Sequence, residues 1–264
     1  MMTDINAPKN NIILYCNIKH IDNRIPLIQH HLRTESPSIL ILVETHHRTL
    51  QATFPNYNVY EYNVDISYSG VIVLINKSTI TRNLRLTSNN RHDCVSFEIT
   101  QNNTNIKVEA HYVSPNTQLQ IQRLNSDIIL GDFNSKHPIF NNLASNPNGK
   151  ILAKTVKNER LNVLNDNTPT YTDRSTGSTD VLDLILTNNK TLNKIENTFL
   201  SDDFNSDHVT INVVLKTSPP PAHLIHLDLT LGTLTGLATL IIFSTPSLQP
   251  NLAPTHLHST VSMN

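Results

Sequence analysis

The sequence lacks several features that would define its class at once. It has no tryptophan, and its 264 residues include only two cysteines, Cys16 and Cys94. Two cysteines are too few for a disulfide framework and fit a reducing, intracellular compartment, where either can be a free buried thiol. The opening residues, MMTDINAPKNN, have no basic stretch followed by an apolar one, so they predict no secretory signal and no strong import signal.

An excess of positive charge is missing as well. The chain has 20 Lys and Arg residues against 21 Asp and Glu residues. A strongly basic balance would by itself indicate a nucleic-acid partner. Net charge therefore argues neither for DNA nor decisively against it.

The end of the chain is almost free of charge. All 20 basic residues lie at or before Lys216, and Asp228 is the one charged residue after it. The run from Leu229 to Leu248 is long enough to span a bilayer, but its glycines, threonines and proline make it weakly apolar, and no basic flank orients it. We find no firm indication of a membrane span. We expect a flexible N-terminus at 1–10, one domain at 11–216, and a Pro/Leu/Thr-rich tail at 217–264 that is disordered or read from a shifted frame.

Short apolar runs alternate with helical patterns before that tail, which is typical of an α/β domain. Five apolar runs predict buried strands, at 11–16, 38–43, 70–75, 127–130 and 181–186. Residues 94–100 and 105–113 alternate and predict antiparallel neighbours. Apolar residues recur at helical spacing at 21–32 and 149–160. The sequence predicts an α/β fold of two packed mixed β-sheets flanked by helices, a four-layer sandwich.

The segment DIILGDFNSKH places two polar groups just beyond an apolar run. Asp132 and Asn134 are one residue apart where the strand ends, so both side chains can reach one phosphate and its attacking water. The alternative is an ordinary turn, because Gly, Asp and Asn dominate turns for conformational reasons.

Glu44 and Asn17 follow two other apolar runs. Glu44 ends SILILVE, and a carboxylate at the end of a buried strand must stay wet or find a cation such as Mg²⁺. Asn17 ends NIILYCN, where a carboxamide can orient a metal ligand or a phosphate oxygen. A solvated strand end and a turn-forming asparagine are the simpler alternatives.

The segment NSDHVTINVVL holds Asp207 and His208 directly before an alternating strand. A histidine held in one tautomer is suited to stabilising a phosphate at neutral pH, although a lone histidine is usually structural. Asp183 interrupts the apolar run VLDLIL, and a buried aspartate needs a partner. We expect that partner to be His208.

Other polar residues are less informative. Tyr112 ends a strand and could donate its hydroxyl to a phosphate, although a half-buried tyrosine is the common case. Several histidines lack zinc-like spacing with Cys or Asp and are expected at the surface: His30, His31, His46, His47 and His137.

The order of these residues along the chain resembles that of the endonuclease/exonuclease/phosphatase superfamily. Its members share a strand-terminal Asn, a metal-binding Glu, a GD-x-N motif and a closing S-D-H. Within it, GDFNSKHPIFNN, NPNGKIL, LNVLNDNTPTYTDR and STDVLDLILTN are similar to segments of the endonucleases of insect-type non-LTR retrotransposons. The resemblance covers roughly residues 10–216.

The resemblance implies a Mg²⁺-dependent endonuclease, with Mn²⁺ as a substitute, that nicks DNA to leave a 3′ hydroxyl for reverse transcription. It implies that Glu44 binds the metal with Asn17 and Asp207 nearby. It also implies that Asp132 positions or deprotonates water, that Asn134 holds the phosphate, that Asn17 and Tyr112 contact the substrate, and that Asp183 orients His208. A nuclear location follows from the resemblance alone.

The chain also departs from the pattern. Only 19 residues separate Tyr112 from Asp132, which predicts a shortened outer helix between them. The reverse transcriptase that normally follows is absent from this chain, so we expect a fragment, a truncated copy or a domain recruited elsewhere. The odd tail favours a catalytically silent remnant as one alternative function. A hydrolase of the same fold acting on abasic DNA or a phospholipid is another. If DNA is the substrate, Lys19, Lys136 and Arg174 are expected to form a local basic rim.

Overall fold

The computed structural model describes residues 10–47, 50–62, 70–89, 91–101, 103–121, 124–201 and 204–217. The chain divides after Pro220, and the second unit, 221–264, lies outside the described residues. The expected N-terminal segment and tail therefore remain predictions, as does any membrane span at 229–248. Within the described part, no helix is long and apolar enough to cross a membrane.

The first sheet has six strands in the order β13-β14-β1-β2-β4-β3. Its members are β1 (Asn10–Asn17), β2 (Pro37–Val43), β3 (Tyr57–Tyr62), β4 (Val71–Asn76), β13 (Ile195–Ser201) and β14 (Thr210–Leu215). β1 and β2 are parallel, and β14 runs antiparallel to β1. The central strands β2 and β4 are buried along their whole length, as their unbroken apolar sequences predict.

The second sheet also has six strands, in the order β5-β6-β7-β8-β12-β9. Its members are β5 (Thr81–Asn89), β6 (His92–Gln101), β7 (Thr104–Val113), β8 (Ile128–Asp132), β9 (Asn162–Val163) and β12 (Asp183–Thr187). β6 and β7 are antiparallel neighbours as expected, β7 and β8 are parallel, and β12 is antiparallel to β8. A separate hairpin joins β10 (Tyr171–Thr172) and β11 (Thr179–Asp180).

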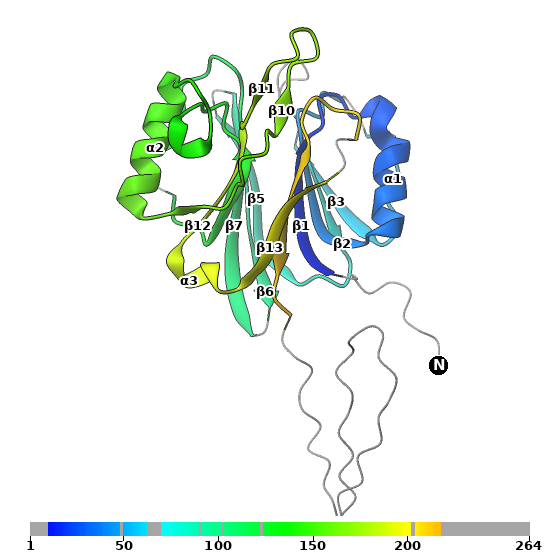
Figure 1. The fold of residues 1–264 in the computed structure, drawn as a ribbon. Helices are drawn as coiled ribbons and strands as arrows, with labels where there is room; N and C mark the ends of the chain where they lie inside the picture. The colour runs from blue at the N-terminus through cyan, green and yellow to red at the C-terminus, as the bar shows by residue number, and fades with distance from the viewer. Residues whose placement is uncertain are drawn as a thin grey trace, which may run out of the picture. The chain divides into compact units, whose positions relative to one another are not determined.

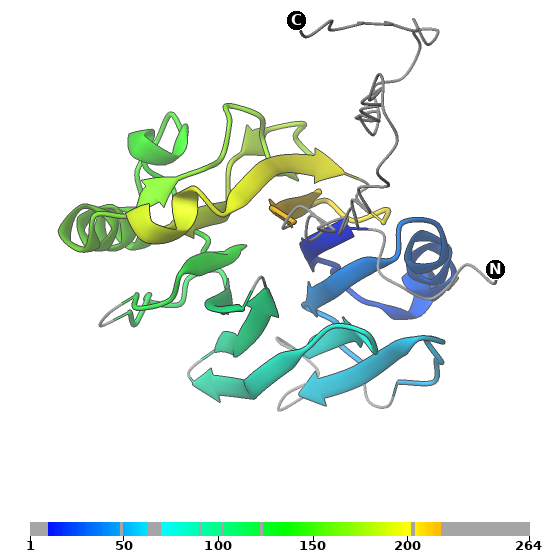
Figure 2. The same cartoon turned by 90° about the horizontal axis from the view of Figure 1, so that it is seen from below.

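The sheets pack face to face with a helix on each outer side (Figures 1 and 2). α1 (Ile25–Thr34) covers the first sheet and α2 (Pro147–Glu159) covers the second. Short pieces complete the domain: the 3₁₀ turns η1 (Asp22–Arg24) and η2 (Pro138–Phe140), and α3 (Asn189–Leu192). α2 begins at an Asn146 cap, whose side chain accepts from Gly149 N, and has Pro147 at its first position. The four-layer α/β sandwich is confirmed.

Three apolar cores hold these layers together. The largest lies between the sheets and includes Ile41, Val73 and Val108. A second lies between α1 and the first sheet, and a third between α2 and the second sheet. Alternate residues of β1, β2, β4, β8 and β12 feed opposite cores, which fixes the register because a slip by one residue would exchange the two faces.

The helix expected between Tyr112 and Asp132 is not formed by the described residues of that segment, so this prediction was wrong. The segment instead packs Leu119 and Leu124 into the third core. The Asn148 side chain accepts from Leu119 N and donates to Thr117 O, at 2.9 and 2.7 Å. These bonds give an irregular backbone the partners that a helix would otherwise have provided.

Candidate active site

The strand directions bring the polar residues to one edge of the sandwich. Parallel β1 and β2 both end there, and so do parallel β7 and β8. β12 and β14 are antiparallel to these strands, so they begin at the same edge. Asn17, Glu44, Tyr112, Asp132, Asp183 and His208 therefore meet, although up to 191 residues of sequence separate them.

A cleft of about 660 Å³ opens at this edge. We call it the catalytic cleft. Its lining contains most of the expected site residues together with residues from the β10–β11 hairpin: Lys19, Glu44, His46, Arg91, Tyr112, Ser114, Pro115, Asn116, Asp132, Asn134, Lys136, Tyr171, Asp173, Ser178, Asp180, Leu182, Asp207 and His208. Asn17 and Asp183 lie behind this surface and hold lining residues in place.

Asp132 is the most enclosed acid of the cleft, with 1% of its surface exposed. Its Oδ1 accepts from Asn134 N at 2.9 Å, and its Oδ2 accepts from Asn17 Nδ2 at 3.0 Å. Burial raises the pKa of Asp132 to about 7, with Asp183 adding to the rise and His208 opposing it. A carboxylate with a pKa near neutrality can accept a proton from water at physiological pH.

Asn17 links the two sheets through its carboxamide. Its Nδ2 donates both to Asp132 and to Glu44 Oε1, the latter at 2.9 Å. Its Oδ1 accepts from Lys19 N at 3.2 Å. Asn17 thus orients two carboxylates, and its oxygen is already bonded to the backbone.

Glu44 and Asn134 both leave their strands in the left-handed backbone region, with φ of 52° and 45°. Such conformations are uncommon outside glycine and cluster where side chains are aimed for function. For Asn134 the result is a side chain that donates to Val113 O at 2.8 Å and lies 3.4 Å from Asp132 Oδ2. Asn134 therefore supports Asp132 directly.

Glu44 is held in its ionised form. Burial alone would raise its pKa, but hydrogen bonds from His46, Tyr112 and Asn17 outweigh burial and lower the pKa to about 2. The same contact with Glu44, together with burial, raises the pKa of Tyr112, whose hydroxyl therefore stays protonated. Glu44 supplies a permanent negative charge at the cleft.

His208 and Asp183 form the expected pair. His208 Nδ1 lies 2.8 Å from Asp183 Oδ2, and its Nε2 faces Asp132 Oδ2 at 3.8 Å. Burial would lower the pKa of His208, but Asp183 and then Asp132 outweigh burial and raise it to about 10. His208 is thus an imidazolium at neutral pH. Asp183 is the first residue of β12 and does not interrupt the strand. It is therefore at the edge of the sheet that carries the cleft, although its exposed fraction is 0%.

The expected basic rim is only partly formed. Lys19 and Lys136 line the catalytic cleft, but Lys19 pairs with Asp207, and Lys136 Nζ lies 2.5 Å from Asp180 Oδ2. Arg174 points elsewhere, donating to Asn205 O and Ser206 O. The lining holds five carboxylates against two lysines and one arginine. The lysines lie at the cleft as expected but compensate local acids, so the basic rim gives only part of the electrostatic support expected for DNA.

Three neighbours of the site were not identified from the sequence. His46 Nε2 lies 3.5 Å from Glu44 Oε2, the Tyr171 ring lies 4.8 Å from that of His208, and Tyr15 accepts a hydrogen bond from Asp132 N. The surface assignment was also wrong for His31 and His47, which are 8% and 3% exposed. His47 is buried because its ring nitrogens bond Thr45 and Glu61, each at 2.9 Å.

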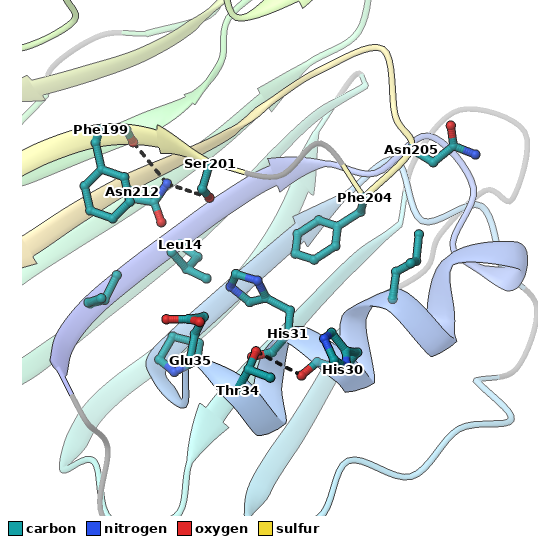
Figure 3. Close-up of a pocket in the computed structure, with 13 residues that line it drawn as sticks. Leu14, His30, His31, Thr34, Glu35, Phe199, Ser201, Phe204, Asn205 and Asn212 are labelled. Atoms are coloured by element: carbon teal, nitrogen blue, oxygen red, sulfur yellow. Dashed lines mark hydrogen bonds between the residues drawn. The ribbon is translucent and has the colours of Figure 1, made fainter.

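A second cavity, of about 640 Å³, lies on the outer side of the first sheet (Figure 3). It is formed by α1 together with β1, β13 and β14, and its walls include Leu14, Leu27 and Phe199. The rings of His31 and Phe204 meet edge to face at 5.2 Å. This cavity, which we call the α1 cavity, contains none of the expected site residues and no cluster of carboxylates.

Comparison with known proteins agrees with the geometry. Residues 99–212 match the family model described as endonuclease-reverse transcriptase, a range that includes Tyr112, Asp132, Asn134, Asp183 and His208. No curated protein sequence matches the chain significantly.

Solved structures share the fold. The endonuclease domain of TRAS1, a telomere-specific non-LTR retrotransposon, is 16% identical, with a TM-score of 0.63 over 79% of this chain and 99% of that one. An AP endonuclease from Archaeoglobus fulgidus is 15% identical, with a TM-score of 0.59 over 78% and 99%. The 3′ phosphatase NExo from Neisseria, bound to a product DNA hairpin, is 14% identical, with a TM-score of 0.57 over 78% and 99%. Residues 99–212 thus match an endonuclease-type family model, and the domain has the fold that these nucleases share.

Proposed function

We propose that the protein is a Mg²⁺-dependent endonuclease that nicks DNA and leaves a 3′ hydroxyl and a 5′ phosphate. The observation that carries the proposal is the meeting of an ionised Glu44, a near-neutral Asp132 and a protonated His208 around one open cleft. Phosphodiester hydrolysis needs an ionised group that binds a cation, a base that accepts a proton near neutral pH, and a positive group that stabilises the developing charge. Glu44, Asp132 and His208 have these three states in that order.

Asp132 is the proposed base. Its oxygens are fixed by Asn17 and Asn134, so one lone pair keeps a constant direction toward the cleft. The attacking water gives its proton to Asp132 as its oxygen bonds phosphorus, and the bond to the 3′ oxygen breaks. The 3′ oxygen takes up a proton and becomes the hydroxyl.

His208 stabilises the negative charge that develops on the phosphate oxygens. Its Nδ1 is bonded to Asp183, so the other ring nitrogen, Nε2, points to the cleft beside Asp132. A fixed donor aimed at developing charge costs no reorganisation during the reaction. Tyr112 and Asn134, at the same edge, are the proposed phosphate contacts.

The residues fit a hard divalent cation. Glu44 stays ionised although it is largely buried, and Asp207 and Asn17 lie at the neighbouring strand ends. When bound there, Mg²⁺ would neutralise phosphate charge and polarise a phosphate oxygen, and Mn²⁺ would substitute.

Asp132, Asp183 and His208 form the one group of three potential ligands within 4.8 Å of one another in the described part of the chain. We assign that group to proton and charge handling instead, because His208 is protonated and Mg²⁺ prefers oxygen ligands.

The biological setting is the most specific part of the proposal. The family model that matches is of the endonuclease-reverse transcriptase kind, and the TRAS1 domain belongs to a non-LTR retrotransposon. A nick that leaves a 3′ hydroxyl would prime reverse transcription in such an element.

Conversion of supercoiled plasmid to the nicked form tests the proposal. Purified protein is expected to nick with Mg²⁺ or Mn²⁺ and to stop when the metal is chelated. Glu44→Ala should raise the Mg²⁺ concentration needed for half-maximal rate, while Glu61→Ala, a carboxylate outside the catalytic cleft, should not. Absence of metal-dependent cleavage of plasmid, abasic DNA and phospholipid alike would replace the proposal with a silent remnant.

Abasic DNA is the rival substrate, because an AP endonuclease shares the fold. A duplex with one abasic site and its intact counterpart distinguish the two. Equal rates on both favour the general nickase, and cleavage of the abasic duplex alone favours the rival.

A further inference from the structure

A second group of polar side chains lies on the outer face of the β6–β7 hairpin, away from the catalytic cleft. On β6, Val95 and Phe97 point into the core between the sheets. Residues two apart share a face of a strand, so His92 and Cys94 point to the opposite, outer side. His111 on β7 is the cross-strand partner of Cys94. One thiol and two imidazoles thus share one patch of the sheet.

The two histidines are in direct contact. His92 Nε2 lies 3.0 Å from His111 Nδ1, and the ring centroids are 5.2 Å apart. The other nitrogen of His111, Nε2, faces Glu109 Oε2 at 3.6 Å, which is too long for a hydrogen bond. This Nε2 is buried and has no hydrogen-bond partner in the described part of the chain, and His111 as a whole is 5% exposed.

The two histidines differ in charge, because His92 is neutral and His111 is protonated at neutral pH. Burial, and then His111, lower the pKa of His92 to about 4, so His92 is neutral and its Nε2 can accept a hydrogen bond from His111 Nδ1. Burial would also lower the pKa of His111, but contacts with Cys94 and Glu109 outweigh burial and raise it to about 9. Without a bound cation, one proton lies between two imidazoles beside a thiol. A cation can take the place of that proton.

We propose that His92, Cys94 and His111 bind one borderline-soft divalent ion of the zinc class, through His92 Nε2, His111 Nδ1 and Cys94 Sγ, with Glu109 orienting His111. The spacing in the sequence does not reveal this set, because the ligands come from two strands and meet only through the register of the hairpin.

The distances suit such an ion. Zn–N bonds of about 2.0–2.1 Å in a tetrahedral site place two nitrogens about 3.3 Å apart, close to the 3.0 Å between His92 Nε2 and His111 Nδ1. A metal-bound imidazole usually donates its other N–H to a carboxylate, and Glu109 lies on that side of His111.

The thiol needs to move. The three ligating atoms are not within 4.8 Å of one another as the side chains stand, so Cys94 must change its rotamer. Cys94 is only partly buried, whereas Cys16 is fully buried in another layer. The mixture of imidazole and thiolate selects zinc-class ions over Mg²⁺, which separates this site from the catalytic cleft.

A bound ion would add a second link between the paired strands β6 and β7, on the outer face of the sheet. The inner face of the same hairpin carries Asp93 and Tyr112, which are paired across the strands, and Tyr112 contacts Glu44. An ion on the outer face would therefore stiffen the strand end that delivers Tyr112. Because it binds only the folded protein, it would also raise the melting temperature.

Titration of the reduced, metal-free full-length protein with Co²⁺ tests the site through absorption. Wild type is expected to take up Co²⁺ with a thiolate-to-metal charge-transfer band that saturates at one equivalent and is displaced by Zn²⁺. Cys94→Ser should lose the band and His92→Gln should weaken binding. Glu109→Gln should weaken it on the order of 10–100-fold. Cys16→Ser is the matched control and should keep the band.

Three results would overturn the proposal. One is the absence of a charge-transfer band in wild type, and another is its loss in Cys16→Ser but not in Cys94→Ser. The third is uptake that depends on Asp183 and not on His92, as Asp183→Asn would reveal, which would move the ion to the catalytic cluster. Circular dichroism of each metal-free variant shows whether it folds. If Cys94→Ser does not fold, the test uses His92→Gln, because His92 is partly exposed.

Discussion

The catalytic cleft and the α1 cavity have nearly the same volume, about 660 and 640 Å³, yet their chemistry is opposite. The catalytic cleft is built from strand ends, where the chain leaves the sheet and can present carboxylates and amides. The α1 cavity is lined by residues of α1, among them Leu27 and His31, and by side chains of β1, β13 and β14 such as Leu14 and Phe199. The comparison teaches that volume does not identify a site, whereas the chemistry of the lining residues does.

The largest expected effect comes from removing the reacting groups of the catalytic cleft. Asp132→Ala and His208→Ala should each lower the rate of plasmid nicking by about 10²- to 10⁴-fold, as a base and a charge stabiliser would. Phe199→Ala, in the α1 cavity, is the matched control and should leave the rate unchanged. If Phe199→Ala lost as much activity as Asp132→Ala, the α1 cavity would also take part in the reaction.

Substitution of a core residue that lines the α1 cavity should lower stability and leave the catalytic rate unchanged. Leu14 is 2% exposed and packs in the second core, so Leu14→Ala should cost about 2–5 kcal/mol of unfolding free energy. Urea denaturation measures the loss, and the kcat of the folded fraction should stay close to wild type. A large fall in kcat without loss of stability would contradict the division between the two cavities.

The pH dependence sharpens the comparison, because the proposed base and the proposed charge stabiliser both line the catalytic cleft. Asp132 must be ionised to act as a base, so the rate should fall as pH drops below about 7. His208 must be protonated to stabilise charge, so the rate should fall as pH rises past about 10. A bell-shaped plot of kcat/KM is therefore expected, falling about tenfold per pH unit outside the two limbs.

Two variants assign the limbs. His208→Gln should remove the alkaline limb and move the acid limb to higher pH, because the charge of His208 lowers the pKa of Asp132. Phe199→Ala should keep both limbs. A flat profile between pH 5 and 9 in wild type would show that Asp132 is not the titrating base.

The sequence predicted well what depends on strand ends. Apolar runs fixed the places of Asn17, Glu44 and Asp132, and a lone aspartate in an apolar run correctly required His208 as its partner. All of these inferences used local pattern and the cost of burying charge.

Loop geometry and pairing between loops were not predictable in the same way. Lys19 pairs with Asp207, which lies 188 positions later in the sequence. The sequence alone therefore could not show that the charge of Lys19 is neutralised. The segment before β8 was expected to be helical, but its described residues form no helix, and a distant side chain, Asn148, bonds the backbone of Thr117 and Leu119 instead. Such tertiary partners override local propensity and leave no periodic signal.

The smallest expected effect concerns the tail. Every proposed site residue precedes Val209, and β14 ends at Leu215, so a chain ending at Lys216 should nick plasmid and melt as the full chain does. Lys216 itself is different, because its N–H donates to Lys194 O at 2.9 Å and its carbonyl accepts from Gln101 Nε2 at 2.7 Å. A chain ending at Leu215 loses both bonds and should be about 1 kcal/mol less stable than one ending at Lys216, with unchanged kcat. Paired thermal and urea denaturation of the two truncations measures this difference. A clear loss of stability already at the Lys216 end would show that residues 217–264 contribute to the folded domain.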